Sequence, residues 1–315
     1  MNSSAPKPGT RLSLFLRWSI TLFAIGLLIY LLSNQGWGEI SAAVRQISWS
    51  RFVFVLGLTF ISRLAVTGRW FVLLRSAGLP ISTWQAIRIT FAGLFASNFL
   101  PTTIGGDVVR LGGALRLKYD QAVCLASLVV DRLVGMAGMS MAVPFVLPVL
   151  GKSFSLNRDV RLVFMGLPLI ASLEPPQESW LQRSIVWLKR ELQRFTEAVR
   201  LWVHRPLNLL WALCFSWGHM LCLFGSIWVL LNGMGDPLPL WMIAGLWAVT
   251  YFVTLLPISI NGIGVQELSM VFMFVHFGGI TQTSGLTLAL FMRVLLMLVS
   301  LPGAFFLSGM LMGDR

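Results

Sequence analysis

Nine ionisable side chains lie inside apolar stretches of this sequence, where a charge is costly. They are Arg63, Arg69, Asp107, Arg110, Asp131, Arg132, Glu267, His276 and Arg293. Inserting a charged residue at membrane depth costs at least about 2.5 to 3.5 kcal/mol, so such residues usually face a partner or a watery cavity. We therefore expect these side chains either to pair with one another or to line a site.

The spacing of these residues predicts some of their partners. Asp107 and Arg110 are three residues apart and can meet on one helix face. Asp131 and Arg132 are adjacent and point about 100° apart, so we expect each to pair with another helix. Ion pairs that only lock the bundle are the alternative to a functional role, and for Asp131, Arg132 and Arg63 the sequence leaves both open.

Two stretches interrupt apolar helices in the same way. The first, residues 98–110, contains Pro101, and the second, residues 255–267, contains Pro257. In each, leucine precedes the proline, and isoleucine, glycine and a carboxylate follow it. Proline cannot donate a backbone hydrogen bond, and glycine permits left-handed backbone. In lipid such a break is tolerated only where protein or a watery cavity receives the freed backbone groups.

The helix that resumes after each break is suited to an anion. A helix beginning at Gly105 and Gly106, or at Gly262 to Gly264, directs unpaired N–H groups and a positive dipole end into the interior. Paired broken helices in two halves are typical of a midplane transport site. The candidate substrate-binding residues are Arg69, Asn98, Pro101, Gly105, Gly106, Asp107, Arg110, Asp131, Arg132, Pro257, Asn261, Gly262, Gly264, Glu267 and Arg293.

The composition indicates an all-α, polytopic helical membrane protein. The 315 residues are 56% hydrophobic and 11% charged, and the mean hydropathy is +0.79. The net charge of +12 comes from basic residues that flank apolar spans, so it indicates membrane orientation and not nucleic-acid binding. Three cysteines in apolar segments and three histidines, without a metal-binding or nucleotide motif, predict no disulfide framework, cofactor, metal site or catalytic residue.

The apolar spans predict a single domain, residues 1–315, with its N-terminus in the cytoplasm. We expect an uncleaved span at 12–32, an interfacial helix at 39–50 and a span at 51–74. Residues 86–100 are too few to cross, since a crossing needs about 20 residues. Because Arg116 and Lys118 follow, we expect a re-entrant hairpin that enters and leaves on the cytoplasmic side.

The second half is expected to invert this arrangement. Residues 121–150 form an outward span, and whether 162–173 is a full span is left open. Residues 174–206 are an amphipathic cytoplasmic helix that connects the halves or recruits a lipid. Spans follow at 206–231 and 285–312. Between them, 240–256 and 266–277 flank a second hairpin that enters from outside, which makes the two hairpins inverted repeats.

Four motifs in order give the sequence a family resemblance. They are Gly68-Arg69-Trp70; Asn98 to Pro101 with Gly105-Gly106-Asp107 and Arg110; Asp131-Arg132 with Gly135; and Pro257 to Glu267. Together they resemble the transmembrane domain of lysylphosphatidylglycerol synthetases, which also occurs alone as flippase-like, UPF0104-type proteins. In the synthetases this domain translocates the aminoacylated lipid across the bacterial inner membrane. The synthetase domain is not expected here, because the chain ends at Arg315.

The residues and the resemblance together predict a lipid translocase, or flippase, of the bacterial inner membrane. The substrate would be a phospholipid or glycolipid with an anionic or modified headgroup, supplied by a separately encoded lipid-modifying enzyme. The first alternative is an accessory subunit or enzyme of glycolipid or polyprenyl-linked lipid synthesis, and the second is a transporter of small solutes or ions. The lipid, the energy source and assembly into a homo-oligomer are left open.

Overall fold

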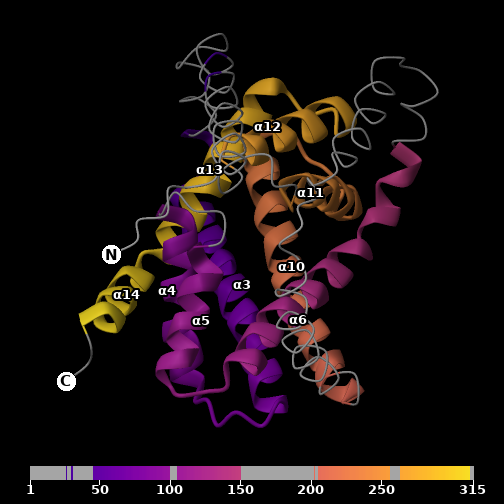
Figure 1. The fold of residues 1–315 in the computed structure, drawn as a ribbon. Helices are drawn as coiled ribbons and strands as arrows, with labels where there is room; N and C mark the ends of the chain where they lie inside the picture. Colours follow the sequence, from indigo (N-terminus) through magenta and orange to yellow (C-terminus); the bar gives the residue numbers. More distant parts are fainter. Residues whose placement is uncertain are drawn as a thin grey trace, which may run out of the picture.

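The structure is a computed structural model that describes residues 26, 30, 45–99, 105–149, 202, 205–255 and 263–312. These residues form helices joined by short loops, and no strand occurs among them (Figure 1). This confirms the all-α prediction. The predicted first span, the stretch 162–173 and the amphipathic helix lie, apart from a few single residues, outside the described part of the chain.

The helices follow one another with few loop residues between them. They are α3 (Trp49–Ser76), α4 (Thr83–Phe99), α5 (Gly105–Arg116), α6 (Gln121–Ser140), the 3₁₀ turn η1 (Val143–Phe145), α10 (Pro206–Met234), α11 (Leu240–Leu255), α12 (Val265–Phe272), the π-helical turn η2 (Met273–Phe277), α13 (Gln282–Ser300) and α14 (Pro302–Met312). Four stretches in the described residues are long and apolar enough to cross a membrane: α3, α6 with η1, α10 and α13. The protein is therefore a multi-pass membrane protein.

The longest helices, α3 and α10, pack against each other along their whole length in opposite directions. At one end of the pair, a Cβ on Gly68 of α3 would lie 2.6 Å from the Phe215 ring of α10, so only glycine allows this approach. At the other end, Gly233 of α10 lies against Arg51 of α3. Gly235, with φ of 85°, ends α10 in the left-handed conformation that favours glycine. This pair forms the central axis of the bundle.

Helices α4 and α5 form a second antiparallel pair. A Cβ on Gly93 of α4 would lie 2.8 Å from the Gly106 carbonyl oxygen of α5, and one on Gly113 would lie 2.9 Å from Ile89. The loops before α4 and after α5 lie at the same end of the bundle, where α3 ends and α6 begins (Figure 1). The two helices on either side of the first predicted break thus lie side by side.

The second half surrounds the largest apolar core. Side chains of α10, α11, α12, η2 and α13 pack there, including the fully buried Ile227, Ile243, Phe274 and Leu286. A Cβ on Gly245 of α11 would lie 2.6 Å from the Val146 backbone nitrogen just after η1, so this core also reaches the end of the α6 segment. The helices on either side of the second break, α11 and α12, belong to this core (Figure 1).

Two predicted boundaries were wrong, one of them at a proline. The span expected at 285–312 is two helices, because Pro302 cannot donate a backbone hydrogen bond, and α14 begins there. Within the span expected over 121–150, the α-helix ends at Ser140 and a 3₁₀ turn that contains Pro144 follows, and Gln121–Phe145 together are long and apolar enough to cross a membrane. Trp49, assigned to an interfacial helix, instead begins α3 after the N-cap residue Ser48.

Candidate functional site

Five charged side chains from α3, α5 and α6 form one hydrogen-bonded network, here called the five-residue cluster. It consists of Arg69, Asp107, Arg110, Asp131 and Arg132. Its centre is Asp131, whose Oδ1 accepts from Arg69 Nε at 2.7 Å and whose Oδ2 accepts from Arg110 Nη2 at 3.1 Å. One carboxylate therefore joins arginines of two other helices, as the sequence predicted for Asp131.

Asp107 extends the network toward the surface of the bundle. Its Oδ2 accepts from Arg132 Nε at 2.7 Å, and its Oδ1 lies 3.5 Å from Arg110 Nη1. The expected pairing of Asp107 with Arg110 is confirmed, and Arg132 pairs with another helix, as predicted. Side-chain exposure rises from 2% at Asp131 to 19% at Asp107 and 55% at Arg132. The network thus connects a buried centre to an accessible arginine.

Small and aromatic neighbours hold the inner arginines in place. Gly135 lies one helical turn beyond Asp131, and a Cβ there would lie 2.8 Å from Arg69 Nη1. Ser216 of α10 accepts from the same nitrogen at 3.1 Å. The guanidinium carbon of Arg110 lies 4.4 Å from the centroid of a Trp70 ring, which is a cation–π contact. These contacts leave the inner arginines little freedom to move.

Helical rise places the cluster well inside the bundle. Asp131 is ten residues from the first residue of α6, which is about 15 Å along the helix. Arg110 is six residues from the last residue of α5, or about 9 Å. Both helix ends lie at the same end of the bundle, so Asp131 and Arg110 lie inside the bundle and not at that end.

The cluster carries an excess of positive charge. Three arginines face two aspartates, which leaves one positive charge without a carboxylate among the five. The Nε atom of Arg110 is buried and has no hydrogen-bond partner in the described residues. Leaving such a donor unpaired is costly, because a buried polar group loses its bonds to water. An anion that enters through Arg132 would supply both the missing charge and further acceptors.

A second, smaller ion pair lies beside the other break. Glu267 of α12 accepts from Arg293 Nε of α13 at 2.5 Å through Oε1, and its Oε2 accepts from the Gly264 N–H at 2.8 Å. Gly264, with φ of 79°, directly precedes α12. Here one carboxylate meets one arginine, and the same carboxylate caps its own helix. Arg293 Nη2 is buried without a partner in the described residues.

The other candidate residues are distributed as follows. Asn98, near the end of α4, donates through Nδ2 to the Leu296 carbonyl oxygen at 3.2 Å and to Ser300 Oγ at 3.0 Å, so it ties α4 to α13. Gly105 and Gly106 begin α5, as predicted. The remaining candidates, Pro101, Pro257, Asn261 and Gly262, lie outside the described residues.

Sequence reasoning missed three neighbours of the site. Ser216 gives no sign of its role, because a serine in an apolar helix commonly bonds to its own backbone. Trp70 and Gly135 belong to the motifs quoted above, but their contacts with the arginines could be identified only from the fold. Three residues beyond Ser216 on α10, His219 Nδ1 lies 2.6 Å from Ser62 Oγ, a part-buried contact that the sequence did not suggest.

Comparison with known protein families gives a match that covers most of the chain. A family model described as the lysylphosphatidylglycerol synthase TM region matches residues 16–303, nearly the whole chain. No curated protein and no solved structure matches. The matched region includes all five residues of the cluster and the Glu267–Arg293 pair.

Proposed function

The chain belongs to the lysylphosphatidylglycerol synthase TM family, and from this premise we propose that it is a lipid translocase. It moves a phospholipid or glycolipid with an anionic or modified headgroup between the two leaflets of the bacterial inner membrane. The headgroup crosses at the five-residue cluster while the acyl chains stay in lipid. Translocation itself forms and breaks no covalent bond. Any modification of the headgroup is therefore a different reaction, which we assign to a separately encoded enzyme.

The excess charge of the cluster is the observation that carries this proposal. Three arginines and two aspartates at membrane depth attract a phosphate more strongly than a balanced set would, because charges interact strongly at low dielectric. The half-exposed Arg132 is the first group that a headgroup would meet. A phosphate bound there can replace the carboxylate of Asp107 as the partner of Arg132. The network can therefore exchange partners while every buried charge keeps a partner of opposite charge.

We also infer that α4 and α5 form a re-entrant hairpin. At 1.5 Å per residue they are about 25 and 18 Å long, which is shorter than a hydrocarbon core of about 30 Å. Their outer ends share one side of the bundle. The pair α11 and α12 would enter from the opposite side as the inverted repeat.

Cysteines placed at Gly78 and Lys118, in a background without native cysteines, should react with the same side-restricted thiol reagent. Labelling from opposite sides would refute the hairpin.

The distribution of basic residues supports an orientation. Arg75, Arg116, Lys118 and Arg205 lie at or beside the shared end of α3, α5, α6 and α10. No lysine or arginine occurs from Pro206 to Met292. By the positive-inside rule the basic end faces the cytoplasm.

A leaflet-access assay tests the proposed function. Purified protein is placed in liposomes that contain fluorescent lipids with anionic, aminoacylated, sugar-bearing or zwitterionic headgroups, and an impermeant quencher is added outside. We expect inner-leaflet anionic or modified lipid to become accessible and the zwitterionic lipid to remain protected. Arg132→Gln should slow the movement about tenfold, the loss of roughly one charge-assisted contact.

The exposed Arg75→Gln variant is the matched control, since it removes the same charge from an arginine that lies outside the cluster, at the end of α3. It should move lipid at the wild-type rate. No movement of any lipid by folded wild-type protein would overturn the proposal, as would equal movement by wild-type protein and Arg132→Gln.

A further inference from the structure

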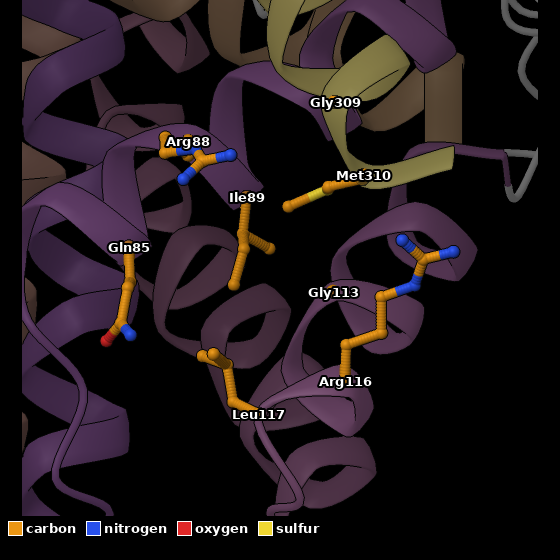
Figure 2. A pocket seen from close by; sticks show the side chains of 8 residues that line it. All are labelled: Gln85, Arg88, Ile89, Gly113, Arg116, Leu117, Gly309 and Met310. Atoms are coloured by element: carbon orange, nitrogen blue, oxygen red, sulfur yellow. The ribbon is translucent and has the colours of Figure 1, made fainter. Parts of the chain in front are cut away.

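Arg63 lies near the middle of α3, far from both ends of this membrane-spanning helix. It is about 21 Å along the axis from Trp49 and about 20 Å from Ser76. An arginine close to a helix end can extend its guanidinium toward the membrane surface. Arg116 has such a position, because it is the exposed last residue of α5 and lines a pocket there (Figure 2). Arg63 is too deep to reach either surface in this way.

The guanidinium of Arg63 has no partner of opposite charge in the part of the chain that the structure describes. Among these residues it forms neither an ion pair nor a hydrogen bond. The Thr67 hydroxyl donates to the Arg63 backbone carbonyl oxygen at 3.0 Å and does not contact the side chain. An arginine at this depth is costly and usually faces a partner or a cavity. Its unpaired charge therefore points to a ligand that is an anion.

Two aromatic neighbours show which way Arg63 faces. Trp70 is seven residues, or two turns, further along α3 and projects from the same side of the helix. Its ring lies 4.4 Å from the guanidinium carbon of Arg110 in α5. Phe60, three residues before Arg63, packs against Phe91 of α4 with ring centroids 5.8 Å apart. Arg63 thus lies on the face of α3 that is directed toward α4 and α5.

Polar side chains continue from the five-residue cluster to the level of Arg63. In the cluster, Ser216 of α10 accepts from Arg69. About one turn further along α10, His219 Nδ1 lies 2.6 Å from the Oγ atom of Ser62, the residue before Arg63. Six residues separate Arg63 from Arg69, which is about 9 Å along α3. A headgroup that moves deeper than the cluster therefore meets polar atoms and a further cation.

We propose that Arg63 is a second binding position for the phosphate of the translocated lipid, deeper in the membrane than the five-residue cluster. The phosphate passes from Arg132 and Arg110 to Arg63, whose guanidinium suits its oxygens in charge and geometry. A second position also helps the phosphate to leave the first, because passage through a membrane requires binding that is shared between sites and not too tight at one of them. This inference rests on the proposed translocation and assigns its next step.

Arg63→Met separates this role from a role in stability. The variant removes an unpaired charge from an apolar region, so its thermal midpoint in detergent should equal or exceed that of the wild type. In the leaflet-access assay it should move anionic lipid about tenfold more slowly, through the loss of one charge-assisted contact. Arg63→Lys keeps the charge and should keep most of the rate. A wild-type rate in Arg63→Met, or a lower thermal midpoint, would overturn the proposal.

Arg75→Met is the matched control, because it makes the same change in the same helix at an exposed residue in the last turn. It should move lipid at the wild-type rate. Equal slowing in Arg63→Met and Arg75→Met would mean that the total charge of the protein matters and not the position of Arg63, which would also overturn the proposal.

Photo-crosslinking detects the second position without requiring transport. Phosphatidylglycerol with a photoreactive group on its headgroup is added to the full-length protein in vesicles of zwitterionic lipid, and labelled peptides are mapped by mass spectrometry. We expect labels beside Arg63 in α3 and beside Arg132 in α6, and Arg63→Met should keep only the label in α6. A wild-type protein that moves lipid but is labelled in α6 alone would overturn the second position and leave the proposed function intact. Labelling beside Arg63 without any lipid movement would support the position and overturn only the translocation.

Discussion

Helices α5 and α12 each resume after a break, and each carries a carboxylate at its third residue. In α5 this residue is Asp107, and in α12 it is Glu267. Both carboxylates accept from arginine side chains, at Arg132 and Arg293 respectively. From the sequence the two stretches look like copies.

The surroundings of the two carboxylates differ in charge. Asp107 shares one arginine, Arg110, with Asp131, so that three arginines meet two carboxylates, and Arg132 remains half exposed. Glu267 pairs with one arginine and also caps its own helix through the Gly264 N–H. The first region has charge to offer a ligand, whereas the second is a balanced pair. The same local motif thus lies in a cluster with excess positive charge in one half, where we propose the anion site, and in a balanced ion pair between helices in the other.

The largest effect is expected at the centre of the first region. Asp131→Ala leaves the buried Arg69 without a carboxylate and leaves Arg110 with Asp107 alone, and should lower the free energy of unfolding by about 3–5 kcal/mol. Denaturation of the purified protein in detergent measures this. Asp120→Ala, on the same helix, removes only the N-cap bond to the Val123 N–H and should cost about 1 kcal/mol. Equal losses in the two variants would contradict the buried network.

A double substitution separates the two regions more sharply. Glu267→Gln should cost about 3 kcal/mol, and adding Arg293→Met should restore most of it, because a buried pair can be replaced by apolar groups with little loss. Asp131→Asn with Arg69→Met should recover less, since Arg110 still loses its 3.1 Å contact with Asp131 and keeps only Asp107 at 3.5 Å. The free energies of unfolding of the single and double variants test this. Equal recovery in both regions would remove the distinction between them.

A smaller effect is expected from the close packing around Arg69. Gly135→Ala places a methyl group against the guanidinium, and overpacking of this kind costs about 1–3 kcal/mol. Gly112→Ala, in α5, meets no atom within 4 Å and should stabilise the helix by up to about 1 kcal/mol. Opposite shifts in thermal midpoint are the expected result. A lower thermal midpoint in both variants would contradict the claim that close packing around Gly135 causes the loss of stability.

The smallest effect concerns Asp236, which lies outside the spans and next to the second region. Burial raises its pKa, but hydrogen bonds from the Ser284 and Thr281 side chains and from the Thr281 N–H outweigh this and leave the pKa below its ordinary value. Its contribution to stability is therefore complete above the unfolded pKa of about 3.9 and is lost as the pH falls through the folded value.

The Asp236→Asn variant isolates this contribution. The difference in the free energy of unfolding between wild type and variant should be constant near neutral pH and should shrink below about pH 4. Denaturation curves at several pH values provide the measurement. A difference that grows as the pH falls would show that the folded pKa is raised.

The sequence predicted the helices better than their partners. Apolar length located α3, α10 and the pair around each break, and helical spacing predicted that Asp131 and Arg132 have different partners. It could not predict that Arg69, 62 residues before Asp131, is one of them, because such a contact depends on how helices pack. Pro302 was overlooked because the apolar composition continues through it, although its missing N–H ends the helix.

The sequence analysis placed Arg293 together with Arg69 and Arg110 among the candidate substrate-binding residues. Both breaks look alike in residue type, so nothing local distinguished them. In the first region the arginines and carboxylates come from three helices. In the second region they come from two. Counting these residues requires the fold. The count is the feature that distinguishes the candidate site at the five-residue cluster from the Glu267–Arg293 ion pair.

The most direct test compares Arg132→Gln with Arg293→Gln in the leaflet-access assay, with the rate of anionic-lipid movement divided by the amount of folded protein. We predict that Arg132→Gln keeps wild-type stability and loses about tenfold in rate. Arg293→Gln should be less stable but should move lipid at the wild-type rate per folded molecule. Full movement by Arg132→Gln together with loss in Arg293→Gln would contradict the account and assign the headgroup to the second region.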